Sequence, residues 1–275
     1  MEMEKTQYSV LMSVYYKEKA EYLRAAMDSI WDQSVKTDEF ILVCDGPLNA
    51  ELDAVVEDME ASHRELHVLR LEKNLGLGNA LNEGMKHCRN DLVARMDSDD
   101  ISRPDRCEKQ LRVFGENPEL SICSGIVEEF TVSTGAVEAR RVPPETQEEI
   151  LAFARTRNPF NHPCVMYRKS AVEAAGGYRS IFLLEDYCLW VRMLQNGAKA
   201  YNLQEPLLWM RIGSDLYKRR AGWKYAQSQK ALFREMKDSG FISSAQYVKS
   251  VSVRTVGALV PNGLRRMLFK TLLRD

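Results

Sequence analysis

The sequence lacks any long apolar run, and this limits how the chain could meet a membrane. Nowhere do about 18 apolar residues follow one another, as a membrane-spanning helix requires. The opening residues MEMEKTQYSV also lack the apolar core of a secretory signal. We therefore expect a cytoplasmic protein without a spanning helix.

Paired cysteines are missing as well. The six cysteines are scattered, none forms a CxxC pair, and most lie within apolar runs. This pattern is typical of buried, reduced thiols in a cytosolic protein. Internal repeats and low-complexity tracts are also absent, so we expect one large globular domain, or one domain with an appendage.

The net charge of −1 conceals an asymmetry along the chain. Residues 206–275 hold 14 Lys and Arg against 4 Asp and Glu, a net charge of +10, whereas residues 1–205 carry −11. We therefore divide the chain into an acidic body, 1–205, and a basic C-terminal region, 206–275, which we expect to be helical. Such a region predicts contact with an anionic partner, such as a membrane surface, a phosphate or another subunit.

Apolar segments alternate with helical patterns through the first 118 residues. Four buried strands are expected, at residues 8–16, 40–46, 67–71 and 92–96. Apolar residues at helical spacing follow the first three of them: Leu23, Met27 and Ile30; Leu52, Val55, Val56 and Met59; Leu77, Leu81 and Met85. The alternation predicts a mostly parallel α/β sheet, in which ligands bind beyond the carboxyl ends of the strands. Asp45 and Asp97 both occupy that position.

The pattern changes in residues 119–205. We expect two strands joined by a turn at Ser133–Gly135, then a short strand and a helix that stops at Gly176–Gly177. A further helix should end at Gly197. The change of pattern divides the body into two halves, about residues 1–118 and 119–205.

The stretch LVARMDSDDISRP places three carboxylates where a strand ends. Asp97 and Asp99 are two residues apart, so in an extended chain both project to the same side. Two such carboxylates suit Mg²⁺ or Mn²⁺, which prefer oxygen ligands and often complete their shell with substrate phosphates. The alternative is a solvated turn that caps the next helix, which Pro104 could begin. Asp100 is the weakest of the three candidates and could serve only as that cap.

Three more carboxylates allow two interpretations each. Asp45, in VCDGP, could shape a tight turn or accept hydrogen bonds from a nucleotide base. Glu185 and Asp186 could mark an ordinary helix N-terminus. Alternatively, one of the two is a general base whose pKa is tuned by its like-charged neighbour.

The segment NLGLGNALNEG contains a G-x-G at Gly76 and Gly78. Leu81 stands where a dinucleotide motif needs its third glycine, and the segment follows the third strand rather than the first, which argues against a nicotinamide site. A helix entry that lets the backbone approach a nucleotide remains possible. His162 precedes a proline, and it is either a structural histidine or a residue that contacts the acceptor or a phosphate. Arg211 follows an apolar stretch and could bind a diphosphate.

In their order along the chain, these segments resemble the family 2 glycosyltransferases of GT-A fold, the bacterial capsule, O-antigen and exopolysaccharide enzymes in particular. The resemblance covers residues 7–212. The matching segments are SVLMSVYYKEKAEYLRAAMDSIWDQ, LVCDGP, EKNLGLGNALNEG, ARMDSDDISRPDRCEKQ, HPCVMYRKS with GGY, and LLEDYCLWVRM.

The resemblance implies a mixed, mostly parallel sheet flanked by helices, with a nucleotide-binding half at about residues 1–118 and an acceptor-binding half at 119–205. It also implies transfer of a single sugar with inversion. The donor would be a nucleotide sugar, UDP-galactose or UDP-glucose, and the acceptor a glycan or a polyprenyl-diphosphate-linked sugar, with no nucleic acid involved. By position, the resemblance assigns these roles: Asp45 to the uracil, Asp97 to the ribose or metal, Asp99 to the Mn²⁺ or Mg²⁺ ion, Asp186 with Glu185 to the base, and Ser13, Val14, Asn74 and Gly76 to the nucleotide pocket.

Two departures from the family pattern refine this expectation. Cys44 replaces the acidic residue that often precedes the base-binding Asp, and no Q-x-x-R-W motif is present, which favours one sugar per encounter over processive synthesis. Sugar nucleotidyltransferases are an alternative class, but they usually need a glycine-rich loop after the first strand, and residues 13–28 contain no glycine. A non-catalytic membrane-associated scaffold is the other alternative.

The end of the chain predicts a basic amphipathic helix. Its apolar residues are Leu264, Met267, Leu268, Leu272 and Leu273, and its basic residues are Arg265, Arg266, Lys270 and Arg274. Such a helix could hold the protein at the cytoplasmic face of the inner membrane, or could pack on the body or a partner chain.

Overall fold

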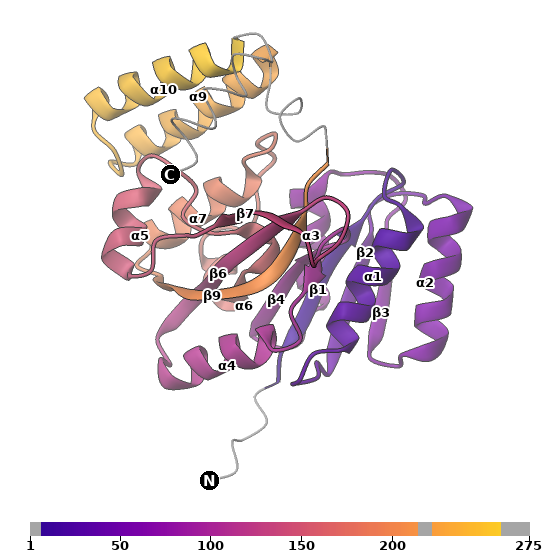
Figure 1. Ribbon diagram of the computed structural model, residues 1–275. Coiled ribbons are helices and arrows are strands. Elements are labelled where there is room, and N and C mark those ends of the chain that lie inside the picture. Colours follow the sequence, from indigo (N-terminus) through magenta and orange to yellow (C-terminus); the bar gives the residue numbers. More distant parts are fainter. Residues whose placement is uncertain (1–6, 214–221, 260–275) are drawn as a thin grey trace.

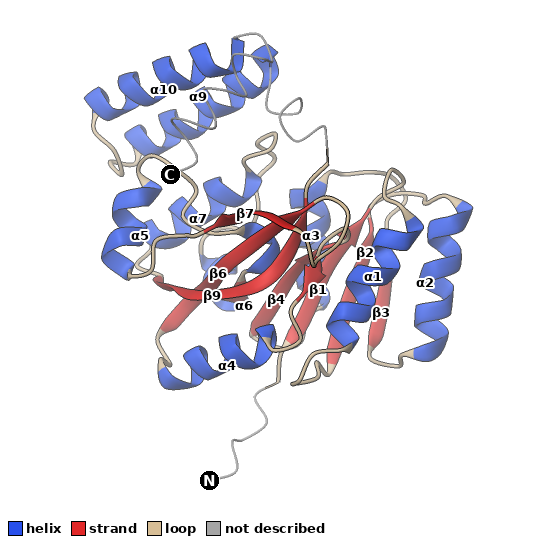
Figure 2. Ribbon diagram, in the orientation of Figure 1, coloured by secondary structure: helices blue, strands red, loops and turns tan. Residues whose placement is uncertain are grey.

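A nine-stranded sheet forms the centre of the protein, in a computed structural model that describes residues 7–213 and 222–259. The strand order is β3-β2-β1-β4-β8-β6-β9-β5, and β7 pairs with β6 (Figure 2). Helices cover both faces (Figure 1). The fold class predicted from the sequence, a mixed and mostly parallel α/β sheet, is therefore confirmed.

The first half of the chain builds the parallel part of the sheet. Its strands are β1 (Ser9–Val14), β2 (Glu39–Cys44), β3 (Leu66–Arg70) and β4 (Leu92–Asp97), all parallel to their neighbours within this group. The helices between them are α1 (Ala20–Trp31), α2 (Ala50–Ser62) and α3 (Leu77–His87). α1 and α2 pack on one face of the sheet and α3 on the other, because their apolar stripes bury against opposite sides of the strands.

The second half adds strands of both directions. β8 (Met166–Arg168) joins β4 to β6 (Leu120–Phe130) in antiparallel pairing, and β9 (Lys199–Arg211) lies parallel to β6. The short strands are β5 (Ile101–Ser102) and β7 (Val137–Arg141). The helices are α4 (Arg106–Glu116), α5 (Gln147–Ala154), α6 (Lys169–Ala174), α7 (Glu185–Gln195) and the short 3₁₀ helix η1 (His162–Cys164).

Two expectations about helix positions are wrong. Residues 206–211 were expected to be helical, but they continue β9 as far as Arg211, and the helix that follows in the described chain begins at Gly222. The helix expected from Pro104 begins at Arg106 instead. The division of the chain at 205/206 stays a prediction, although β9 runs across it.

The described C-terminal helices, α9 (Gly222–Asp238) and α10 (Ser244–Leu259), pair with each other beside α7 (Figure 1). Phe233 and Met236 of α9 are buried in one cluster with Tyr187 and Val191 of α7. α9 therefore packs on the body through the helix that carries the candidate base. The amphipathic helix expected at 264–274 lies outside the described residues.

The expectations about cysteines and membrane spans were also tested. All six cysteines are buried and unbridged, as predicted. Within residues 7–213 and 222–259, no helix has both the length and the apolar character needed to cross a bilayer.

Candidate active site

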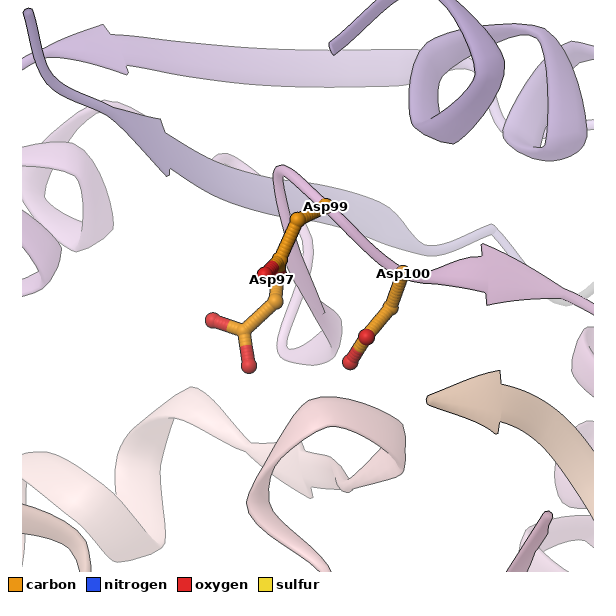
Figure 3. A group of neighbouring side chains, drawn as sticks. All are labelled: Asp97, Asp99 and Asp100. Carbon is orange, nitrogen blue, oxygen red and sulfur yellow. The ribbon is translucent and has the colours of Figure 1, made fainter. Parts of the chain in front are cut away.

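The acidic turn lies between β4 and β5. One carboxylate oxygen from each of Asp97, Asp99 and Asp100 can be chosen so that all three lie within 4.8 Å of one another. Figure 3 shows the three side chains around this turn. Three carboxylates at this separation are a suitable donor set for Mg²⁺ or Mn²⁺.

Asp100 is part of this cluster, so the expectation that it only caps the next helix is wrong. The N-cap of α4 is Asp105, whereas Asp100 is 2% exposed and accepts a 2.7 Å hydrogen bond from the Arg211 backbone N–H. Burial, and then the charges of Asp99 and Asp97, raise the pKa of the Asp100 carboxyl well above its ordinary value. A bound divalent cation would relieve that repulsion.

Arg211 fastens the turn from the end of β9. Its Nε donates a 3.0 Å hydrogen bond to the Asp99 carbonyl oxygen. Its guanidinium lies 3.8 Å from the ring centre of Tyr22 and 4.6 Å from that of Phe130. The structure therefore places Arg211 beside the cluster, and its contact with a diphosphate stays a prediction.

Two buried arginines, which the sequence analysis did not single out, support the turn. Arg95 Nη2 donates to Asp97 Oδ1, and Arg106 Nη2 donates to the Arg95 carbonyl oxygen at 2.7 Å. Both residues are 0% exposed. An arginine inside the apolar strand LVARM was the one signal in the sequence that could have revealed the first of them.

The residues predicted to line a nucleotide pocket meet at the ends of β1 and β2. The backbone N–H of Asp45 donates to the Val14 carbonyl at 2.8 Å, and Ser13 is in register with Asp97 on the neighbouring strand. The Asp45 carboxylate accepts from the backbone N–H groups of Leu75 (2.6 Å) and Gly76 (3.0 Å). Asp45 therefore does shape a turn, and its oxygens keep further lone pairs for a ligand.

Close packing fixes the turn that contains Asp45 and Gly46 against Asn74. Asn74 Nδ2 donates to the Asp45 carbonyl at 3.1 Å. Gly46 has φ +86°, and a Cβ there would lie 2.6 Å from the backbone nitrogen of Asn74. Only glycine permits both the conformation and the approach. The structure thus brings together the predicted pocket residues Ser13, Val14, Asp45, Asn74 and Gly76.

Glu185 and Asp186 open α7, and a residue with strained backbone lies just before the N-cap of this helix. Leu183 has φ 61°, a left-handed conformation that is uncommon for residues other than glycine and clusters at functional sites. Asp186 Oδ2 accepts a 2.6 Å hydrogen bond from Asn158 Nδ2, a partner that the sequence analysis missed. The Asp186 carboxylate is therefore held in a defined orientation.

Glu185 turns toward α3 instead. A Cβ placed on Gly78 would lie 3.2 Å from Glu185 Cγ, so the two side-chain positions are in close contact. Burial, and to a smaller degree the charge of Asp186, raise the pKa of the Glu185 carboxyl. The two adjacent acids therefore have different surroundings.

The glycine-rich segment docks the loop that precedes α7. Asn82 Nδ2 donates to the Tyr178 carbonyl and Asn82 Oδ1 accepts from the Tyr178 N–H, both at 2.8 Å. Asn79 Nδ2 also donates to Ser180 Oγ at 3.0 Å. α3 thus contacts Asp45 at its entry and the loop before α7 along its side, a second contact that the helix-entry interpretation did not include.

The charges of both acidic sites act on Tyr178. Burial, and then the charges of Asp186 and Asp97, raise the pKa of its phenol. His162 Nε2 lies 3.1 Å from Tyr178 Oη, and burial followed by the charge of Arg95 lowers the pKa of His162 well below its ordinary value. His162 is thus a neutral partner of Tyr178, and its contact with a ligand stays a prediction.

Two features define a GT-A transferase fold. Parallel strands carry an acidic turn at the carboxyl end of β4, and the second half of the chain, joined through antiparallel β8, supplies a second acidic pair. Comparison with known proteins agrees. The chain belongs to glycosyl transferase family 2, whose family model matches residues 9–176. It is therefore a glycosyltransferase, which sets aside the nucleotidyltransferase and scaffold alternatives.

Relatives match the chain over almost its whole length. It is 40% identical over 266 residues to the amylovoran biosynthesis glycosyltransferase AmsE of Erwinia amylovora, covering 96% of this chain and 98% of that protein. It is 36% identical over 267 residues to an Escherichia coli UDP-Gal:alpha-D-GlcNAc-diphosphoundecaprenol beta-1,3-galactosyltransferase, covering 97% and 96%.

Solved structures share the fold at low sequence identity. S. aureus TarS 1-349 in complex with UDP-GlcNAc has a TM-score of 0.69 at 16% identity, covering 97% of this chain and 76% of that one. The mannosyltransferase PcManGT from Pyrobaculum calidifontis, in complex with GDP-Man and Mn²⁺, has a TM-score of 0.64 at 13% identity, covering 97% and 80%.

Proposed function

We propose that this protein is a metal-dependent, inverting hexosyltransferase that moves one sugar from a UDP-sugar to a polyprenyl-diphosphate-linked sugar in bacterial surface polysaccharide synthesis. One observation carries the proposal: the described structure holds a three-carboxylate cluster after β4 and, at the start of α7, a separate carboxylate, Asp186, that Asn158 orients. The name of the Escherichia coli relative supports the acceptor class and UDP-galactose as the first donor to test, with UDP-glucose second.

The donor would bind across the ends of β1, β2 and β4. Asp45 and the backbone around Asn74–Gly76 would receive the nucleotide base, and Ser13–Val14 would line its pocket. Asp97, Asp99 and Asp100 have the oxygen donors to hold Mn²⁺ or Mg²⁺, which would stabilise the negative charge of the departing diphosphate. Arg211, beside the same turn, would add a positive charge near that group.

Asp186 is the base that the geometry favours. An acceptor hydroxyl is a poor nucleophile until a positioned carboxylate takes its proton. Asn158 orients Asp186, whereas Glu185 packs against α3 and is assigned to positioning. Attack from the side opposite the diphosphate would break the anomeric bond in one displacement and invert that carbon.

A lipid-linked acceptor would bring the enzyme to the cytoplasmic face of the inner membrane. The net charge of +10 in residues 206–275 supports peripheral contact with anionic headgroups. Co-sedimentation of full-length and 1–260 protein with vesicles containing anionic lipid tests this contact. Equal binding of the two proteins would remove the terminal segment from the proposal.

The function is tested by sugar transfer from labelled UDP-Gal, UDP-Glc, UDP-GlcNAc and UDP-GalNAc to a GlcNAc-diphosphate-lipid, with Mn²⁺. We expect transfer from one of the first two donors, and losses of at least about 100-fold in Asp99→Asn and Asp186→Asn. Glu57→Gln, at an exposed position on α2, is the matched control. Unchanged transfer in both site variants would refute the proposal.

A further inference from the structure

We propose that Arg95 is a positioning residue for the acidic turn, which holds Asp97 by one carboxylate oxygen and leaves the other oxygen to a divalent cation. The inference rests on the proposed function, since it concerns the same metal site. Arg95 itself would touch neither the cation nor the donor.

The pairing follows from the alternation of β4. Arg95 and Asp97 are two residues apart on one strand, so both side chains leave the sheet on the same face. Arg95 Nη2 donates to Asp97 Oδ1, and the Arg95 side chain is 1% exposed while that of Asp97 is 33% exposed. The buried arginine thus holds the inner side of a carboxylate whose outer side is open.

The rest of the guanidinium lies in apolar and aromatic surroundings. On this face β4 packs into the cluster that contains Tyr167, Tyr178 and Trp190. Among the described residues, Arg95 Nε and Nη1 have no hydrogen-bond partner. The hydrogen bond to Asp97 is therefore the one side-chain bond of Arg95 that the described structure contains.

Such an arrangement is poorly suited to stabilising the fold. Burying a guanidinium is unfavourable unless its N–H groups are satisfied, and apolar side chains of similar volume often replace buried ion pairs without loss of stability. Arg106 shows the contrast: its guanidinium donates to the carbonyl oxygens of Arg95, Pro163 and Val165 and so ties β4 to the segment around η1. A structural arginine satisfies backbone groups, whereas Arg95 serves a single carboxylate.

The charges give the role a distinctive signature. Removing Arg95 leaves the three carboxylates without that buried counter-charge, so binding of Mn²⁺ alone should not weaken. The orientation of Asp97 would be lost, so turnover should fall. Loss of turnover with retained metal binding separates positioning from general damage to the fold.

The test uses full-length protein with Arg95→Met, Arg95→Lys, Asp97→Asn and the double variant Arg95→Met/Asp97→Asn. Free Mn²⁺ is measured by electron paramagnetic resonance, and kcat is measured at saturating donor. Arg168→Met is the control, because this arginine on the neighbouring strand β8 also bonds a carboxylate, that of Asp91, away from the acidic turn.

We expect Arg95→Met to lower kcat about tenfold or more with Mn²⁺ affinity within about threefold of wild type, and Arg95→Lys to lie between. In the Asp97→Asn background, Arg95→Met should add less than about twofold, because the two residues act through one contact. Arg168→Met should leave kcat unchanged.

Three results would overturn the inference. The first is wild-type kcat in Arg95→Met. The second is a double variant whose loss of kcat equals the product of the two single losses, and the third is an Arg95→Met protein in which Mn²⁺ affinity and unfolding temperature both fall together with kcat. If Arg95→Met does not fold, kcat and Mn²⁺ affinity are compared in Arg95→Lys and in the double variant Arg95→Lys/Asp97→Asn instead. Wild-type kcat and Mn²⁺ affinity in Asp97→Asn would instead argue against the metal site of the proposed function. An impaired Asp97→Asn beside an unimpaired Arg95→Met removes only the role of Arg95.

Discussion

Asn158 Nδ2 donates a 2.6 Å hydrogen bond to Asp186 Oδ2 and so joins the loop after α5 to the first turn of α7. The two residues are 28 positions apart in the sequence. The bond fixes the orientation of the carboxylate that we propose as the general base.

Asn158→Ala should therefore lower kcat by about tenfold or more, because the base loses its orientation while donor binding is untouched. Steady-state kinetics with varied UDP-sugar measures both parameters, and KM for the donor should stay near wild type. Asn196→Ala is the control, since Asn196 bonds the Ala174 carbonyl at the far end of the same helix. Equal kcat in Asn158→Ala and wild type would contradict this role.

Gly78→Ala tests the contact between α3 and Glu185. The added Cβ would lie 3.2 Å from Glu185 Cγ and 3.3 Å from Tyr178 Cβ, so the first turn of α7 and the loop before it must shift. We expect kcat to fall several-fold.

Gly115→Ala in α4 is the control for this substitution, because a Cβ there meets nothing within 4 Å. It should raise the free energy of unfolding by about 0.5–1 kcal/mol through helix propensity, with unchanged kcat. Urea unfolding and kinetics on both variants make the comparison. A fall in kcat of the same size in Gly115→Ala would exclude the contact with Glu185 as the cause.

Glu128 gives a prediction for the dependence of stability on pH. Burial acts to raise the pKa of its carboxyl, but hydrogen bonds from Arg103 and Arg140 outweigh burial, and the net shift is downward. A carboxyl with a lowered pKa in the folded state stabilises the fold above the unfolded-state pKa of about 4.3, and loses that contribution as pH falls toward the folded-state pKa.

Glu128→Gln should thus lower the free energy of unfolding at pH 7 by about 1–3 kcal/mol, with a smaller difference from wild type at pH 4. Urea unfolding at the two pH values measures it. Glu138→Gln, at an exposed position of β7, should show little difference at either pH. A difference for Glu128→Gln that grows from pH 7 to pH 4 would contradict the assigned shift.

The first half of the fold could be predicted from the sequence because its signals are local. The apolar runs that end at Cys44 and Asp97 are buried on both faces, and such strands read as continuous hydrophobic segments. The end of β9 could not be predicted in this way. Leu207 and Leu208 are strand residues because they bury against β6, and Pro206 is tolerated at an irregularity in that pairing.

The candidate site also combines residues predictable from local sequence with residues that depend on long-range contacts. The shared orientation of Asp97 and Asp99 could be predicted from their spacing. The place of Asp100 in the cluster depends on its hydrogen bond from Arg211, which is 111 residues away. Asn82 meets Tyr178 across 96 residues, and no periodic pattern encodes such a contact. Carboxylates at strand ends are visible in a sequence, but the amide and guanidinium groups that orient them become visible only in the folded chain.

The most direct test of the metal site is calorimetric titration of UDP into wild-type protein and Asp99→Asn, each with Mn²⁺ and with EDTA. We expect wild-type protein to bind UDP at least about tenfold more tightly with Mn²⁺, since the ion joins the acidic turn to the diphosphate. Asp99→Asn should bind UDP equally weakly in both conditions. Equal UDP affinity of wild-type protein with Mn²⁺ and with EDTA would contradict a metal-dependent donor site at Asp97, Asp99 and Asp100.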